Sequence, residues 1–303
     1  MKDLAAQLAT TMKQRHWNER YQKLLTQALK DPEVQQFLQD HQLQNNQNAV
    51  LAGSAAIYEF VQAKKTLTLA TGYQPRLLWV NQAIHVSYEP DAAELRRQQK
   101  VVFQQKFKTL AMASDVRQAD LDDYARGVNE RQASYMAAVR FVIDYAKAPK
   151  TFLPGLYLSG PFGVGKTYLL SAIAKELVQQ QVEVLLVHFP TLAVQMKNAI
   201  NDNSVLTKID QIKAVPILML DDIGADALSS WVRDEVLGVI LQYRLQEKLP
   251  TFFSSNFSMK DLEAHLTVNQ RGDQEPIKAA RIMERIRFLA REVVVSGPDR
   301  RFN

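Results

Sequence analysis

Gly160-Pro-Phe-Gly-Val-Gly-Lys-Thr167 is the stretch that decides the fold of this chain. It has the form G-x-x-x-x-G-K-[ST], the phosphate-binding P-loop. Residues Gly155–Ser159 before it are short and mostly apolar, as in a buried strand, and Tyr168–Gln180 after it has apolar residues at helical spacing. A strand, a glycine-rich turn and a helix are the context that the motif requires. The alternative is an incidental glycine turn before a helix.

The residue types of this motif suit a nucleotide. Glycines let the backbone wrap phosphates with its N–H groups, and the N-terminus of the following helix adds a positive dipole end. Lys166 is placed to reach the β- and γ-phosphates, and the Thr167 hydroxyl to bind Mg²⁺. The residues expected to bind ATP in this segment are Gly160, Pro161, Phe162, Gly163, Val164, Gly165, Lys166, Thr167 and Tyr168.

Composition sets the class of the protein. The chain has 303 residues, of which 47% are apolar and 23% charged, as in globular domains. It has no cysteine, which excludes disulfides and Cys-ligated metal sites. No apolar run is long enough for a signal peptide or a membrane span, so a cytoplasmic location is expected. The net charge of +5 permits contact with nucleic acid without arguing strongly for it.

Two domains are expected. Residues 1–112 predict a smaller, mainly helical domain. It includes short β-like runs at Leu67–Tyr73, Leu77–Val80 and Ile84–Tyr88 and a charged helix over Asp91–Met112. Residues 113–126 are polar and predict a linker. Residues 127–303 alternate strand and helix, which is typical of a parallel α/β sheet. Five strands are predicted, at Gly155–Ser159, Val182–His188, Pro216–Leu220, Thr251–Ser255 and Arg291–Val295.

Two carboxylates follow the third of these strands. In P-loop ATPases, Asp221 would hold Mg²⁺ and Asp222 would polarise the attacking water. Because side chains alternate along a strand, the two acids cannot have the same role. A plain strand end with an Asp-capped loop is the alternative.

Asn256 ends the next strand, where a polar side chain can orient the attacking water. Ser254 and Ser255 are the substitutes for that role, and an ordinary strand-to-turn asparagine is the alternative. Near the end of the chain, Lys278–Arg287 is a basic helix, and Arg300-Arg301 follow. A cation near a γ-phosphate stabilises its transfer, often from a neighbouring subunit, although a charge run is also typical of a solvated helix face.

Several motifs together resemble the AAA+ replicative helicase loaders of Firmicutes, the DnaC/DnaI-like family. The resemblance is dense in the second half and weaker in the first, where it includes Thr71–Pro75 and Glu94–Lys100. The motifs that carry it are the P-loop, Leu220–Gly224, Ser230–Val236, Phe252–Phe257 and Ala279–Ile286. It implies an AAA+ ATPase domain that uses ATP and Mg²⁺ and binds single-stranded DNA, and an N-terminal domain that binds the hexameric replicative helicase.

The resemblance also assigns roles to residues. Thr167 and Asp221 match the Mg²⁺ ligands, and Asp222, Asn256 and Arg285 match the catalytic acid, the sensor 1 residue and the arginine finger. A finger implies self-association through the ATPase domain. Arg301, or its neighbour Arg300, matches the arginine of sensor 2.

Relatives often carry a zinc cluster of cysteines and a histidine in the N-terminal domain. Here cysteine is absent and His85 stands alone in that region, so no zinc is predicted. For single-stranded DNA, the segments around Pro190–Ile200 and Lys208–Lys213 are candidates, with Lys197, Lys208 and Lys213 as phosphate contacts. A solvated face is the alternative.

Other functions remain open from the sequence. The accessory ATPase of a transposon would share almost every nucleotide motif, but the long N-terminal domain and the segment around Trp231 argue against it. A small-molecule kinase needs a lid and an acceptor site, and the paired acids suit hydrolysis better. A scaffold controlled by bound nucleotide, without significant hydrolysis, is the third alternative.

Overall fold

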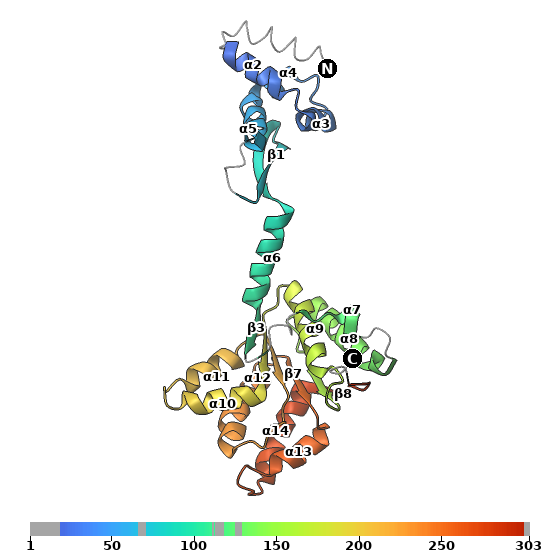
Figure 1. Ribbon diagram of the computed structural model, residues 1–303, viewed down its shortest axis with the longest axis vertical. Helices are drawn as coiled ribbons and strands as arrows, with labels where there is room; N and C mark the ends of the chain where they lie inside the picture. The colour runs from blue at the N-terminus through green and yellow to red at the C-terminus, as the bar shows by residue number, and fades with distance from the viewer. Residues whose placement is uncertain (1–18, 66–70, 111, 113–117, 125–128, 300–303) are drawn as a thin grey trace. The chain divides into compact units, whose positions relative to one another are not determined.

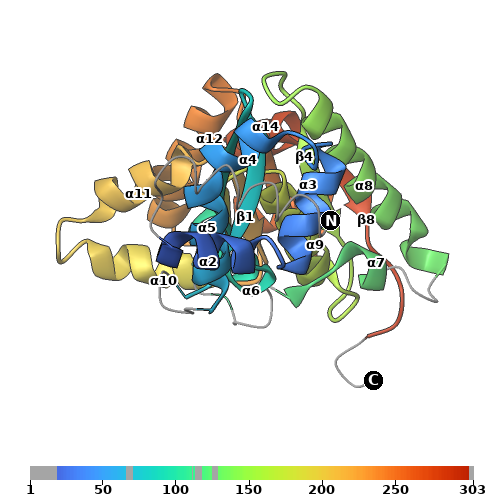
Figure 2. The ribbon, with the colours of Figure 1, turned by 90° about the horizontal axis from the view of Figure 1, so that it is seen from above.

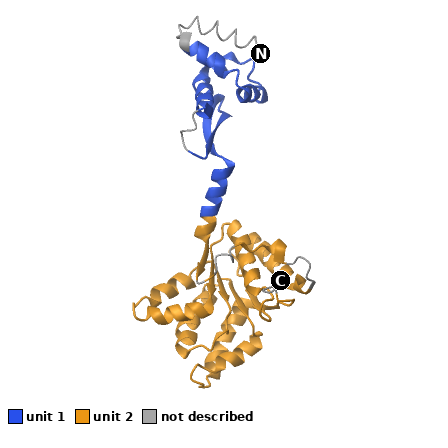
Figure 3. Ribbon diagram, in the orientation of Figure 1, with its two compact units in different colours: residues 1–101 blue, residues 102–303 orange. Residues whose placement is uncertain are grey.

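The computed structural model describes residues 19–65, 71–110, 112, 118–124 and 129–299. The chain divides into two units, residues 1–101 and 102–303, each with its own hydrophobic core (Figure 3). No helix among the described residues is both long and apolar enough to cross a bilayer.

The first unit packs short helices against a β-hairpin. Leu25, Phe37 and Ile57 belong to its core, and α4 and α5 contact the hairpin. Asn81 and Gln82 both have positive φ, 50° and 60°, as a tight two-residue hairpin turn requires. The predicted β-like runs at Leu77–Val80 and Ile84–Tyr88 are therefore confirmed, and most of the run predicted at Leu67–Tyr73 lies outside the described residues. The elements are α2 (Glu19–Ala28), α3 (Pro32–Asp40), α4 (Gln47–Ala52), α5 (Ser54–Lys65), β1 (Tyr73–Val80) and β2 (Ala83–Pro90).

The predicted helix over Asp91–Met112 is wrong at its end. Helix α6 (Ala92–Lys106) stops at Lys106, and β3 (Phe107–Leu110) pairs in parallel with β5. This strand belongs to the sheet of the second unit, so the division between the units falls earlier than the boundary predicted at 112. A four-residue strand depends on its partner, which lies about seventy-five residues further along the chain.

The predicted linker over 113–126 also differs from the structure. Within it, α7 (Leu121–Tyr124) buries Leu121 and Tyr124 in the core of the second unit. The Tyr124 and Tyr168 rings stack with 6.2 Å between their centroids. The described part of this segment therefore belongs to the second unit.

The second unit has a parallel sheet in the order β3-β5-β6-β7-β4-β8. The predicted α/β class is confirmed, and all five predicted strands are present, with β3 as a sixth. Their bounds are β4 (Gly155–Ser159), β5 (Val184–His188), β6 (Ile217–Asp221), β7 (Thr251–Ser255) and β8 (Ala290–Val294).

Helices cover both faces of this sheet, and Figures 1 and 2 show α8 and α9 on the side opposite α10 and α11. One face carries η2 (Asn129–Arg131), α8 (Gln132–Lys147) and α9 (Lys166–Gln179). The other carries α10 (Phe189–Ala199), α11 (Val205–Lys213), η3 (Val232–Leu237), α12 (Gly238–Gln246), α13 (Met259–Thr267) and α14 (Pro276–Leu289). Because the strands are parallel, their carboxyl ends meet at one edge, where ligands bind in such sheets.

Candidate ATP site

The P-loop joins β4 to α9, as the motif predicts. Gly163 and Gly165 have φ of 72° and 102°, a conformation that L-residues with side chains rarely adopt. Gly165 caps α9, which begins at Lys166. The loop therefore presents the amino end of a buried helix, a favourable position for an anion.

Lys166 is held over the loop by three oxygen atoms. Its Nζ donates to the carbonyl oxygens of Gly160 and Pro161 at 2.8 and 2.7 Å, and to Asn256 Oδ1 at 2.7 Å. The residue is only 8% exposed. An ammonium group fixed on the P-loop in this way lies where a nucleotide phosphate can replace these neutral acceptors with a charged one.

Thr167 and Asp221 come together as the Mg²⁺ prediction requires. The Thr167 hydroxyl donates to the two carboxylate oxygens of Asp221 at 2.9 and 3.0 Å. Burial raises the pKa of Asp221, and hydrogen bonds from Ser254 and Thr167 oppose that rise. A hydroxyl and a carboxylate beside a phosphate site are hard oxygen ligands of the kind that Mg²⁺ prefers.

Asp222 leaves the strand in a different direction from Asp221. Its φ of 62° is a left-handed conformation, which is uncommon for a residue other than glycine. Asn256 Nδ2 donates to its carboxylate at 3.4 Å, and His188 Nε2 lies 4.0 Å from it. The two acids therefore have different neighbours, and their separate catalytic roles stay a prediction.

Asn256 connects both halves of the site. Its amide oxygen accepts from Lys166 and its amide nitrogen donates to Asp222. Ser254, considered above as a substitute for Asn256, contacts Asp221 and the backbone of Asp222 instead. Ser255 donates to the Ile223 carbonyl. Among the three, Asn256 is the one whose side chain lies between the P-loop lysine and Asp222.

Several neighbours of the P-loop were missed from the sequence. Tyr124 and Arg131 flank Gly165, and their nearest atoms are 3.4 and 4.0 Å from the point where a Cβ on that glycine would lie. Arg131 also donates to the Pro298 carbonyl, and an Asp299 carboxylate oxygen occupies the point where a Cβ on Gly163 would lie. The segment after β8 therefore runs along the P-loop. Arg300 and Arg301, predicted for sensor 2, lie outside the described residues.

Arg285 lies on α14, and its guanidinium contacts the first residue of α12. Its Nη1 donates to the Gly238 carbonyl at 2.8 Å, and it lines a surface cavity with Asp234 and Tyr243. Burial, followed by the charge of Arg281, lowers the pKa of Arg285. Its described contacts include neither Lys166 nor Thr167, and its role as an arginine finger stays a prediction.

A buried arginine holds the start of α14, the helix that carries Arg285. Arg233 is 1% exposed and donates to Glu275 Oε2 at 2.7 Å and to the Leu266 carbonyl at 2.9 Å. Lys278 and Ser230 donate to the same carboxylate, at 2.5 and 2.8 Å. Hydrogen bonds from Lys278, Ser230 and Arg233 lower the pKa of Glu275 to about 2.

This network predicts an acid-dependent loss of stability. Because the folded-state pKa of Glu275 lies below its ordinary value of 4.5, its contribution is complete above about pH 4.5 and is lost as the pH falls toward 2. Glu275→Gln should lower the thermal midpoint at pH 7 and flatten its fall below pH 5. Glu263→Gln, which removes an exposed pair with Arg287, is the control and should change both much less. Parallel midpoint curves for Glu275→Gln and the unmodified chain would show that the network does not stabilise the fold.

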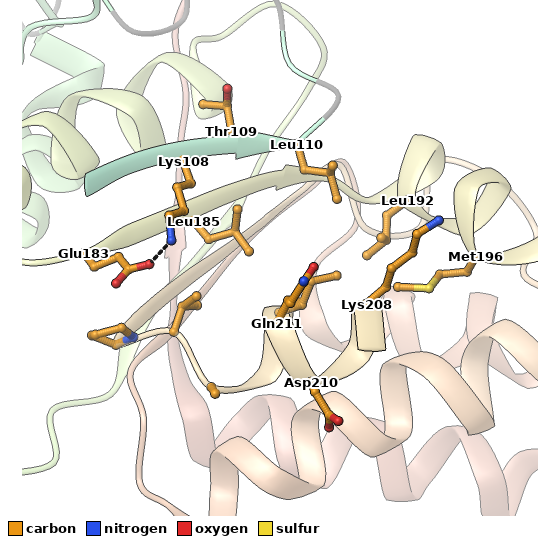
Figure 4. A pocket seen from close by; sticks show the side chains of 14 residues that line it. Lys108, Thr109, Leu110, Glu183, Leu185, Leu192, Met196, Lys208, Asp210 and Gln211 are labelled. Carbon is orange, nitrogen blue, oxygen red and sulfur yellow. Dashed lines mark hydrogen bonds and ion pairs between the residues drawn. The ribbon is translucent and has the colours of Figure 1, made fainter. Parts of the chain in front are cut away.

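The three lysines predicted to contact DNA line three different cavities. Lys197 and Asp222 line one cavity of about 270 Å³, between α10 and the loop that follows β6. Lys208 lines another of about 590 Å³ at the β3 edge, where Figure 4 shows it beside Met196. Lys213 pairs with Asp210 at 2.5 Å and lies over the Tyr243 ring. Each lysine therefore lines a different cavity, and Lys197 is exposed on the one that Asp222 also lines.

The fold and the site define a P-loop ATP-binding protein of the AAA+ class. The model described as "IstB-like ATP binding protein" matches residues 79–302, and that of the "Primosomal protein DnaI N-terminus" matches residues 1–88. The replicative helicase loader DnaI of Bacillus subtilis (strain 168) is 35% identical over 295 residues, which cover 94% of each chain. The chain belongs to the DnaI family.

Solved structures agree with this placement. A crystal structure of DnaI matches with a TM-score of 0.57 and 45% identity, over 66% of this chain and 99% of that one. The DnaC helicase loader matches with a TM-score of 0.51 and 22% identity, over 61% of this chain and all of that one, and at this identity it supports the fold alone.

Proposed function

We propose that this protein hydrolyses ATP to load the hexameric replicative helicase onto single-stranded DNA during initiation and restart of replication. The similarity to the Bacillus subtilis helicase loader, over 94% of both chains, carries this proposal. The second support is the site, where hydrogen bonds join Lys166 to Asn256, Asn256 to Asp222 and Thr167 to Asp221.

We assign each residue a role in hydrolysis from its contacts and from the family resemblance. Lys166 binds the phosphates, and Thr167 and Asp221 are the residues that would hold Mg²⁺, which neutralises phosphate charge when bound. Asp222 accepts a proton from the attacking water, and Asn256 orients that water between Lys166 and Asp222. Arg285 of one subunit stabilises the charge that develops on the phosphate bound by the next.

DNA-stimulated release of phosphate tests the enzymatic part of the proposal. Phosphate release should rise when single-stranded DNA and helicase are added, and Asp222→Asn should remove most of it while ATP still binds. Binding of ATP without release in any of these conditions would instead favour a nucleotide-controlled scaffold.

One observation favours a second candidate, the accessory ATPase of a transposon. The matching ATP-binding model is that of IstB-like proteins, and a protein of insertion sequence IS1162 from Pseudomonas fluorescens is 36% identical over 85 residues. That stretch covers only 28% of this chain. The match of residues 1–88 to the DnaI N-terminus favours the loader.

The first unit is our candidate for the helicase-binding domain. It has a separate hydrophobic core, so a fragment of residues 1–101 should fold alone and retain the helicase on an affinity column without ATP. His85 is exposed on β2, and we expect no zinc in the fragment. Residues 102–303 are the control and should not retain helicase. Stoichiometric zinc in the fragment, or retention by 102–303 alone, would contradict this assignment.

Lys197 is our leading candidate for contact with DNA phosphates. Removal of one lysine–phosphate contact to a single strand should flatten the slope of log affinity against log salt by about 0.7. We expect Lys197→Gln to show this change. Lys213→Gln should show less, because Asp210 and the Tyr243 ring already hold that ammonium group. An unchanged slope in Lys197→Gln, Lys208→Gln and Lys213→Gln would place the DNA elsewhere.

A further inference from the structure

Ser254 is a buried serine that contacts both acids of the ATP site. It lies on β7, next to β6, and is 1% exposed. Its hydroxyl donates to Asp221 Oδ1 at 2.5 Å and accepts from the Asp222 N–H at 2.9 Å. Its carbonyl accepts from the Ile223 N–H at 2.8 Å. One residue therefore fixes three successive residues at the end of β6.

These contacts account for the different directions of the two carboxylates. Asp222 has a φ of 62°, and the bonds to Ser254 on each side of its α-carbon restrain the chain in this uncommon conformation. Asp221 remains in the strand and accepts from Thr167, whereas the Asp222 carboxylate lies beside Asn256. The turn at Asp222 thus keeps the Asp221 carboxylate at the Thr167 hydroxyl and the Asp222 carboxylate at the Asn256 amide.

We propose that Ser254 is a positioning residue that separates the two acids, holding Asp221 against Thr167 and fixing the turn that directs Asp222 toward Asn256. This inference rests on the proposed ATP hydrolysis and adds a residue to it. Ser254 does not contact the nucleotide in this account. It acts through the two acids.

Ser255 provides a matched control on the same strand. It is also fully buried, and its hydroxyl also makes two hydrogen bonds, donating to the Ile223 carbonyl at 2.7 Å and accepting from the Phe257 N–H at 3.1 Å. It contacts neither acid side chain among its described hydrogen bonds. Ser254→Ala and Ser255→Ala therefore remove similar hydrogen bonds from the core, but only the first alters the acids.

The test compares turnover with ATP binding in the presence and absence of Mg²⁺. For Ser254→Ala we expect kcat to fall about tenfold or more, as for the loss of a hydrogen bond to a charged group. Affinity for ATP in EDTA should stay within about twofold of the original, while the gain in affinity on adding Mg²⁺ should shrink. Ser255→Ala should keep both kcat and the Mg²⁺ gain, even if its thermal midpoint falls equally. Ser254→Thr, which restores the hydroxyl, should recover turnover.

Other outcomes separate the two proposals. If Ser254→Ala and Ser255→Ala have equal kcat and an equal increase in ATP affinity on adding Mg²⁺, the positioning role is overturned. The proposal of ATP hydrolysis would still stand. Absence of turnover in the unmodified protein with DNA and helicase would instead overturn the proposed function. If Ser254→Ala does not fold, Ser254→Cys keeps the side-chain volume and weakens the same hydrogen bonds, and an unchanged kcat in that variant would equally overturn the positioning role.

Discussion

Lys166→Ala should abolish tight binding of ATP. The ammonium group is the one cation that hydrogen bonds across the P-loop among the described contacts, and its loss removes the charge-assisted bonds to the phosphates. At roughly 1.5–3 kcal/mol for each such bond, the loss of two corresponds to an affinity at least a hundredfold lower. Titration calorimetry with ATP and Mg²⁺ measures this directly.

The control for this variant is an exposed lysine that makes none of the described contacts of the ATP site. Lys260→Ala, at an exposed position of α13, should bind ATP like the original chain. Lys166→Ala also leaves Asn256 Oδ1 and two carbonyl oxygens without their donor, so its thermal midpoint without nucleotide must be measured as well. A folded Lys166→Ala chain that binds ATP within tenfold of the original would exclude the P-loop as the phosphate site.

Arg285→Ala should leave ATP binding nearly intact and remove hydrolysis. The Arg285 guanidinium donates to the Gly238 carbonyl and lines a cavity together with Asp234 and Tyr243. We therefore expect the phosphate site of the same subunit to bind ATP without it. A guanidinium supplied by a neighbour would stabilise charge that develops only during transfer. Removal of such a finger lowers kcat by about a thousandfold or more in related enzymes.

Mixing inactive chains tests whether Arg285 acts between subunits. An equimolar mixture of Arg285→Ala and Lys166→Ala should regain some turnover, because one kind of interface then combines an intact P-loop with an intact arginine. Arg281→Ala is the matched control on the same helix and should stay active. A mixture that stays inactive, although each variant assembles with the original chain, would leave Arg285 as a residue of the helix surface.

Much of the ATP site could be predicted because its signals are local. The P-loop is contiguous in sequence, and the acids and Asn256 each follow a short apolar strand. In a parallel sheet the carboxyl ends of strands meet, so these residues come together once the strands are found. The predicted bounds of β4 and β7 agree with the structure at both ends.

The features that were missed depend on contacts distant in sequence. Strand β3 has four residues and no turn signal before it, and pairing with β5 makes it a strand. The role of Ser254 follows from the register of β7 beside β6 and from the left-handed turn at Asp222, neither of which a motif encodes. The close approach of Asp299 to Gly163 likewise brings together segments far apart in the sequence of the second unit.

Loading of a replicative helicase onto a closed circle of single-stranded DNA tests the central claim most directly. Helicase retained on the circle after a salt wash would be measured with the original chain, with Lys166→Ala and with no loader, each with and without ATP. Our account predicts retention only with the original chain and ATP. Equal retention with Lys166→Ala, or without ATP, would contradict it.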